Sequence, residues 1–156
     1  MEPKFETKLS FKAVGMMFSG KVKGNELYEL WDRFSKVISE IPNRSNTDMC
    51  YGIVNPFSTK MEDGEMEYVA AVEVDNFNNV PEGMVSIEIP ESHYAIFTHK
   101  GHIRNFMDTI KFVFGQWLPN SDYKIMNAPE LEVYDERFNV DSVDSELEFC
   151  IPVEKK

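Results

Sequence analysis

An internal repeat limits the possible folds of this chain more than any other feature of its sequence. At one constant offset, three matches appear when the sequence is compared with itself: Gly20 with Gly101, Phe57 with Phe138, and EMEYVAAVEV from Glu65 with ELEFCIPVEK from Glu146. In the predicted helices the offset is two positions shorter, which aligns Trp31 with Ile110, and a difference in loop length accounts for the change. The sequence therefore predicts two copies of one structural unit.

The first copy has the element order strand, helix, strand, strand. The apolar residues 11–19 predict a strand that turns at the following glycine. Between residues 25 and 41, apolar side chains recur every three or four positions, which is typical of a helix. Residues 50–54 and 66–74 are rich in strand-forming side chains, and they predict an antiparallel pair joined by a long loop.

The second copy repeats this order. Residues 85–98 predict a strand, residues 106–118 a helix, and residues 131–134 and 147–153 two further strands. Two βαββ units with pseudo-twofold symmetry favour an α+β fold with one antiparallel sheet. We expect both main helices on one face of the sheet and a ligand groove on the other. The prediction is a single domain over residues 1–156, with half-repeats of approximately 5–80 and 81–156.

Charge and composition exclude several classes of protein. There are 27 acidic and 16 basic residues, so the formal net charge of −11 repels nucleic acid and anionic lipid. No apolar run approaches the roughly 18 residues of a membrane span, and the first residues lack the features of a secretory signal. We expect a soluble cytoplasmic protein without direct nucleic-acid or membrane partners. Cys50 and Cys150 lie in apolar runs and are predicted to be buried thiols.

The middle strands carry the candidate ligand-binding residues. Alternation along residues 131–134 places Glu132 and Tyr134 on one face, with Leu131 and Val133 toward the helices. At the same offset that aligns the two glycines, Tyr51 aligns with Glu132 and would share its groove. The predicted groove residues are one carboxylate and four aromatic side chains: Glu132, Tyr134, Tyr51, Tyr68 and Phe149. A carboxylate among aromatic rings suits an organic cation.

Other interpretations of these residues stay open. Aromatic residues on strands are commonly core residues, and a strand glutamate commonly points to solvent. Trp31 and Trp117 fit the apolar stripes of the helices and are predicted to be core. His93, His99 and His102 offer no third metal ligand and are expected at the surface or at a helix start. Common catalytic and nucleotide-binding motifs are absent, so we predict no metal and no cofactor.

Several short motifs resemble one known family. They are WLP at residues 117–119, SxY at 121–123, a strand with Pro129, Glu132 and Tyr134, and the closing ELEFCIPVEK. In combination, over essentially the whole chain, they resemble the GyrI-like small-molecule-binding domain, also called the AraC-type effector-binding domain. That family has a pair of βαββ units.

The resemblance implies binding of lipophilic cationic or aromatic compounds in the central groove. It assigns the counter-charge to Glu132 and the aromatic wall to Tyr134, Tyr51, Tyr68 and Phe149. In many relatives a helix-turn-helix region precedes this module, but here the first predicted strand begins by Phe11, so DNA binding is not expected. We expect a standalone multidrug-sensing or sequestering protein, with a role that can be linked to transcription regulation.

The same resemblance leaves two alternatives. Some standalone relatives hydrolyse reactive cyclopropane-containing compounds, in which case Glu132 would be a general base or electrostatic stabiliser, helped by Tyr51 or Tyr134. The chain could instead bind another protein through its acidic surface. Turnover of an electrophilic substrate separates the enzyme from the binding protein.

Overall fold

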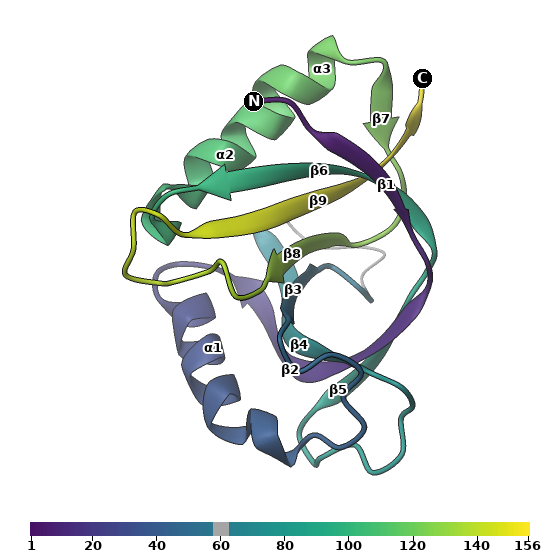
Figure 1. Ribbon diagram of the computed structural model, residues 1–156, viewed down its shortest axis with the longest axis vertical. Helices are drawn as coiled ribbons and strands as arrows, with labels where there is room; N and C mark the ends of the chain where they lie inside the picture. Colours follow the sequence, from purple (N-terminus) through teal and green to yellow (C-terminus); the bar gives the residue numbers. More distant parts are fainter. Residues whose placement is uncertain (58–62) are drawn as a thin grey trace.

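The structure is a computed structural model that describes residues 1–57 and 63–156. Their strands form an antiparallel sheet in the order β1-β6-β9-β8-β3-β4-β2-β5, and β7 pairs with β9 (Figure 1). The strands are β1 (Lys4–Lys8), β2 (Phe11–Lys21), β3 (Cys50–Val54), β4 (Glu65–Val74), β5 (Val85–Ile89), β6 (Ser92–Lys100), β7 (Tyr123–Ile125), β8 (Glu130–Tyr134) and β9 (Glu146–Lys155). The predicted loop between β3 and β4 lies partly in residues 58–62, outside the described residues.

Two helical segments cover the sheet. The first is α1 (Glu26–Val37), which continues as a 3-10 turn over Ile38–Glu40. The second begins with a 3-10 turn and runs through three joined pieces: α2 (Phe106–Phe112), a π-helical stretch (Val113–Trp117) and α3 (Leu118–Asn120). Both occupy the ranges that apolar periodicity predicts, although the second has a non-uniform helical pitch.

The repeat is visible in the strands. The first residues of β4 and β9 are related by the offset that aligns Gly20 with Gly101, and so are the first residues of β2 and β6. Gly20 and Gly101 have backbone φ angles of 137° and 119°, values that favour glycine at the end of each long strand. The predicted α+β class, the tandem βαββ order and the antiparallel sheet are confirmed.

Four strands differ from the sequence prediction. The single strand expected over residues 85–98 is two strands, β5 and β6, because the chain turns at Pro90 and Glu91. Proline has no backbone N–H to donate to a ladder, so an interruption here is physically expected. The sequence does not predict β1 and β7, since both are short and neither shows a long apolar alternation.

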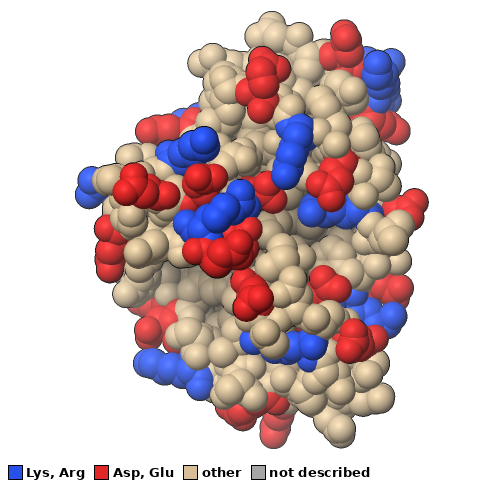
Figure 2. Space-filling view, in the orientation of Figure 1, with Lys and Arg blue, Asp and Glu red and all other residues tan. Residues whose placement is uncertain are grey.

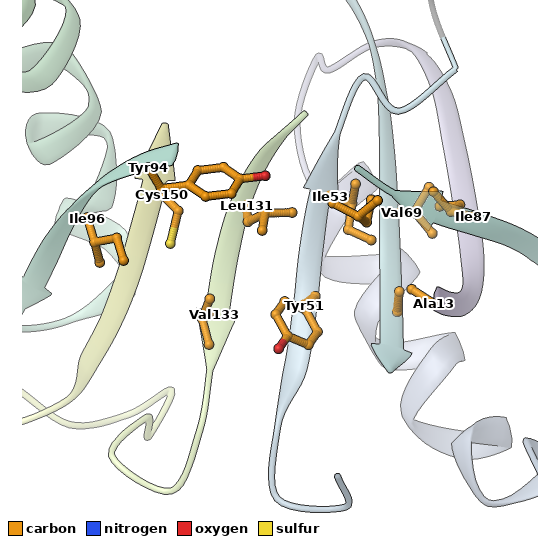
Figure 3. Close-up of a cluster of buried hydrophobic side chains, with 12 residues drawn as sticks. Ala13, Tyr51, Ile53, Val69, Ile87, Tyr94, Ile96, Leu131, Val133 and Cys150 are labelled. Carbon is orange, nitrogen blue, oxygen red and sulfur yellow. The ribbon is translucent and has the colours of Figure 1, made fainter. Parts of the chain in front are cut away.

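The two faces of the sheet have different cores. Both helical segments pack on the same face, α1 mainly over β2 and β4 and α2 over β6 and β9, as predicted. The opposite face carries a separate apolar cluster that includes Tyr51, Ile53, Leu131 and Val133 (Figure 3). Cys150 is fully buried in this cluster, whereas Cys50 is half-buried under α1, so the burial prediction holds completely only for Cys150.

Among the helices formed by the described residues, none has the length and apolar character needed to cross a membrane.

Candidate functional site

The sheet register places Glu132 on the face that the helices cover. Glu132 pairs directly with Gly52, and Gly52 pairs with Ala70, which packs under α1. Leu131 and Val133 belong to the cluster on the opposite face. The predicted orientation of this strand is therefore wrong, and Glu132 and Tyr134 lie on the same side of the sheet as the helices.

Tyr51 is not the structural counterpart of Glu132. Val54 pairs with Tyr68, and Glu132 pairs with Phe149, the residue that matches Tyr68 in the repeat. Val54, three positions beyond Tyr51 in the same strand, therefore holds the equivalent position. An odd change of register moves a side chain to the other face of a strand, which is why sliding the sequence misplaced this pair.

Tyr51 consequently lies outside the candidate site. It is buried on the face opposite the helices, where its ring packs at a tilted angle 5.1 Å from that of Phe11. Burial raises the pKa of its phenol well above the ordinary value. The prediction that Tyr51 shares a groove with Glu132 is wrong.

A chain of hydrogen bonds ends at the Glu132 carboxylate. Tyr68 Oη and Tyr134 Oη each donate to Glu132 Oε1, both at 2.6 Å. The indole Nε1 of Trp31, on α1, donates to Tyr68 Oη at 3.0 Å. No described residue donates to the other carboxylate oxygen, Oε2. Four side chains from α1, β4 and β8 thus form one connected polar unit.

Aromatic rings surround this unit. The Trp31 ring meets Tyr134 edge to face at 5.3 Å and Tyr68 at 6.4 Å. Phe138, in the segment after β8, meets Tyr134 at 4.8 Å. Trp31 is expected in the core from its helical position, but it is only partly buried and covers the tyrosines. From the sequence alone, an indole at this helix position could pack in the core or cover a binding site, and nothing in the pattern separates the two roles.

Phe149 has a different role from the other predicted residues. It lies beside Glu132 in the sheet and on the same face, but it is fully buried. Its ring contacts Phe106 at 5.6 Å and Phe114 at 6.0 Å, both from the helical segment over β9. Phe149 therefore supports the floor of the site from the α2 side.

Gly52 makes the arrangement possible. A Cβ atom at this position would lie 2.1 Å from Tyr68 Oη and 2.7 Å from Glu132 Oε1, closer than atoms can approach. The absence of a side chain leaves the space in which Tyr68 reaches the carboxylate. Sequence reasoning missed Gly52, and a glycine inside a strand is the signal that points to such a close approach.

The Glu132 carboxylate is buried without a basic partner. Only 8% of its surface is exposed, and no Lys, Arg or His among the described residues forms an ion pair with it. Burial raises the pKa of Glu132, although the hydrogen bonds from Tyr134 and Tyr68 act in the opposite direction. The same burial, with the neighbouring carboxylate, holds the pKa of both phenols well above the ordinary value. A cation would compensate this charge.

The surface is hollowed near this unit. Figure 2 shows a depression between the first turns of α1 and the end of β8, and the atoms that line its floor belong to neither acidic nor basic residues. Trp31 and Tyr134 lie on the elements that border it.

His102 and His99 differ in burial and in hydrogen bonding. His102 accepts a hydrogen bond from Arg104 N at a helical N-terminus, as predicted. His99 is buried instead, with Nδ1 at 2.7 Å from Thr109 Oγ1 and Nε2 at 3.1 Å from the His102 carbonyl. Within residues 1–57 and 63–156, no group of three or more potential ligands is placed to hold a metal ion.

Comparison with known proteins identifies the family. Residues 4–153 match the family of integron-associated effector binding proteins, Cass2. The chain belongs to this GyrI-like effector-binding family. The resemblance inferred from the short motifs is thereby confirmed.

One curated relative and two solved structures are similar to this family member. The transcriptional regulator BrlR of Pseudomonas aeruginosa is 31% identical over 145 residues, covering 92% of this chain and 52% of BrlR. The chain thus spans about half the length of that relative. SAV2435 bound to tetraphenylphosphonium shares 22% identity with a TM-score of 0.75, covering 99% of this chain and 94% of SAV2435.

The second structure is the integron cassette protein VCH_CASS2, from the mobile metagenome of Vibrio cholerae. It shares 15% identity with a TM-score of 0.70, covering 99% of this chain and 97% of that protein. At these identities the two structures establish a common fold.

Proposed function

We propose that this protein binds amphipathic organic cations on the helix side of its sheet, with Glu132 as the counter-charge. The observation that carries the proposal is the buried Glu132 carboxylate, which accepts two phenol hydrogen bonds and has no basic partner among the described residues. A desolvated anion among aromatic rings gains most from a ligand that is both positively charged and apolar.

The family supports this assignment. The chain belongs to an effector-binding family, and a protein of the same fold was solved with tetraphenylphosphonium, a lipophilic cation. The relationship to a transcriptional regulator supports a sensing role, while sequestration would use the same site. We propose that both roles operate in the cytoplasm.

Loss of the Glu132 charge tests the proposal. In Glu132→Gln, which keeps the shape of the side chain, tetraphenylphosphonium should bind at least tenfold more weakly, about 1.4 kcal/mol. The neutral triphenylphosphine oxide should lose much less. Isothermal titration calorimetry measures both ligands, and Tyr134→Ala should weaken both because it removes ring surface.

The matched control is Glu136→Gln, which removes one acidic charge from an exposed position beyond β8. Its affinity for the cation should equal that of the wild type. Equal cation affinity in wild type, Glu132→Gln and Tyr134→Ala would refute the site. Unchanged binding in Glu132→Gln with lost breakdown of an electrophilic substrate would favour the hydrolase, because a missing base affects the transition state more than the ground state.

A further inference from the structure

A second cavity lies at the end of β8 that is distant from Tyr134. Its volume is about 550 Å³, within the range of small-molecule sites. It is lined by the end of β3 and the turn after it, by β5 and the turn to β6, and by the connection from β7 to β8: Val54, Asn55, Pro56, Phe57, Glu88, Pro90, Ile125, Met126, Asn127, Ala128, Pro129 and Glu130. The β5–β6 turn and the β7–β8 connection are at the right of Figure 1. Neither Trp31 nor Tyr134 lines it, so it is separate from the site above.

The walls of this cavity combine apolar surface with negative charge. Eight of the lining residues are apolar, and they include one aromatic ring, that of Phe57. The charged lining residues are both acidic, Glu88 and Glu130. A concave surface of mixed polar and apolar character, whose charged lining residues are all acidic, is complementary to a small organic cation.

Of the two carboxylates, Glu130 is better placed than Glu88 to act as the counter-charge of a bound cation. It is half-buried, whereas Glu88 is exposed at the rim. No described residue forms an ion pair with Glu130. Burial and the negative charge of Glu132, two residues along the same face of β8, raise the pKa of Glu130 to about 7. A bound cation would relieve both effects.

Hydrogen bonds outside the cavity fix its walls. Phe57 N donates to Glu67 Oε1 at 3.0 Å, and Glu67 N donates to Asn55 Oδ1 at 2.8 Å, which ties the turn after β3 to β4. On the other side, Met126 N donates to the Pro152 carbonyl at 2.9 Å. A site whose walls are already ordered loses less conformational entropy when a ligand binds.

We propose that this cavity is a second site, for small organic monocations with a compact apolar body, and that Glu130 is its counter-charge. The proposal does not depend on the Glu132 site, since the two sites use different residues. A larger lipophilic cation would bind beneath Trp31, and a smaller quaternary or aryl ammonium compound would bind at Glu130.

Methyl NMR with benzyltrimethylammonium tests this assignment on the full chain. This cation keeps its charge at every pH, and its ring matches the apolar wall. The expected result is saturable shifts of the Met126 and Ala128 methyl resonances, while the Trp31 indole resonance reports the Glu132 site separately. Benzyl alcohol, a neutral compound with the same ring, should produce much smaller shifts.

Three variants locate the charge. Glu130→Gln should weaken binding at Met126 and Ala128 at least tenfold, whereas the control Glu136→Gln should preserve it within about threefold. Glu132→Gln should weaken this binding less than Glu130→Gln does, because Glu132 is the neighbouring charge and not the counter-charge of this cavity. Wild-type affinity should be about fivefold or more lower at pH 6 than at pH 8, because the Glu130 carboxyl gains a proton. The other titratable groups of the cavity and its strand are Glu88, Glu132 and Tyr134. Glu130→Gln should abolish this pH dependence.

The proposal is overturned if Met126 and Ala128 do not shift, or if Glu130→Gln binds like the wild type. It is also overturned if these shifts disappear in Glu132→Gln together with the Trp31 response, because the cavity would then be part of the first site. Failure of the Glu132 site alone would change the Trp31 response and leave the Met126 and Ala128 shifts intact.

Discussion

Replacing Gly52, which pairs with Glu132 from β3, with alanine should disrupt the hydrogen bonds of the Glu132 site. The new Cβ would lie 2.1 Å from Tyr68 Oη, while a normal carbon–oxygen contact is about 3.3 Å, so the phenol must move by about 1.2 Å. That movement breaks the 2.6 Å hydrogen bond to Glu132 and the 3.0 Å hydrogen bond from Trp31. Overpacking costs about 1–3 kcal/mol and each lost hydrogen bond about 1 kcal/mol. We therefore expect Gly52→Ala to lower the free energy of unfolding by about 3–5 kcal/mol.

Urea unfolding, followed by circular dichroism, measures this loss. Gly115→Ala is the matched control, because no atom lies within 4 Å of the Cβ it would add. In that helical segment alanine should be neutral or stabilising by up to about 1 kcal/mol. The double variant Gly52→Ala/Tyr68→Phe removes the oxygen that makes the closest contact, so it should be less destabilised than the sum of the single variants by about 1 kcal/mol or more.

A Gly52→Ala protein within about 0.5 kcal/mol of the wild type, with unchanged fluorescence from Trp31, would refute this reasoning. It would mean that Tyr68 does not lie against the backbone of β3. Additive effects in the double variant would show that the destabilisation arises elsewhere.

Three further predictions concern the core, the cover of the site and the titration of β8. Phe34→Ala should cost about 3–5 kcal/mol in urea unfolding, because Phe34 lies on the face of α1 that packs on the sheet and is fully buried. Tyr28→Ala, at a 69% exposed position of the same helix, should cost less than about 0.5 kcal/mol, and similar losses in both would contradict the helix orientation. In Trp117→Phe, where Trp31 is the remaining tryptophan, tetraphenylphosphonium should change the emission of Trp31, and constant emission at saturating ligand would argue against a covering role. For Glu130, a folded pKa of about 7 against 4.5 means that its favourable contribution is complete below pH 4.5 and is lost as pH rises through 7. Glu130→Gln should therefore gain up to about 3 kcal/mol over the wild type between pH 5 and pH 8 in the absence of ligand, and a pH-independent difference would contradict the burial of this carboxyl.

The repeat and the helical periodicity predicted most of the fold. β4 and β9 follow the offset that aligns Gly20 with Gly101, and Phe34 and Val113 are buried as the helical spacing requires. These features depend on local periodicity, which a single sequence contains. The short strands β1 and β7 could not be found in this way, because they are defined by their pairing with longer strands and not by a pattern of their own.

The sequence predicted that Glu132, Tyr68 and Tyr134 lie together, but it did not predict the face of the sheet on which they lie. Glu132, Tyr68 and Tyr134 do meet, yet on the helix side, because the connection from β8 to β9 differs in length from its counterpart between β3 and β4. Alternation along a strand states which residues share a face but not which face lies under the helices. Only the pairing of Gly52 with Glu132 resolves that choice.

Because the Glu132 site is closed, the affinity of a ligand for it includes the free energy needed to open the site. Glu132 is only 8% exposed, and Trp31 is bonded to one of the tyrosines that hold it, so a ligand that reaches the carboxylate must displace the indole or shift α1. The free energy of that opening is subtracted from the intrinsic binding free energy. A cation offsets the cost because it neutralises a buried charge, while its apolar body replaces the ring contacts that Trp31 gives up. A neutral aromatic of the same size would regain only the ring contacts, which is the physical reason why we expect charge selectivity at this site.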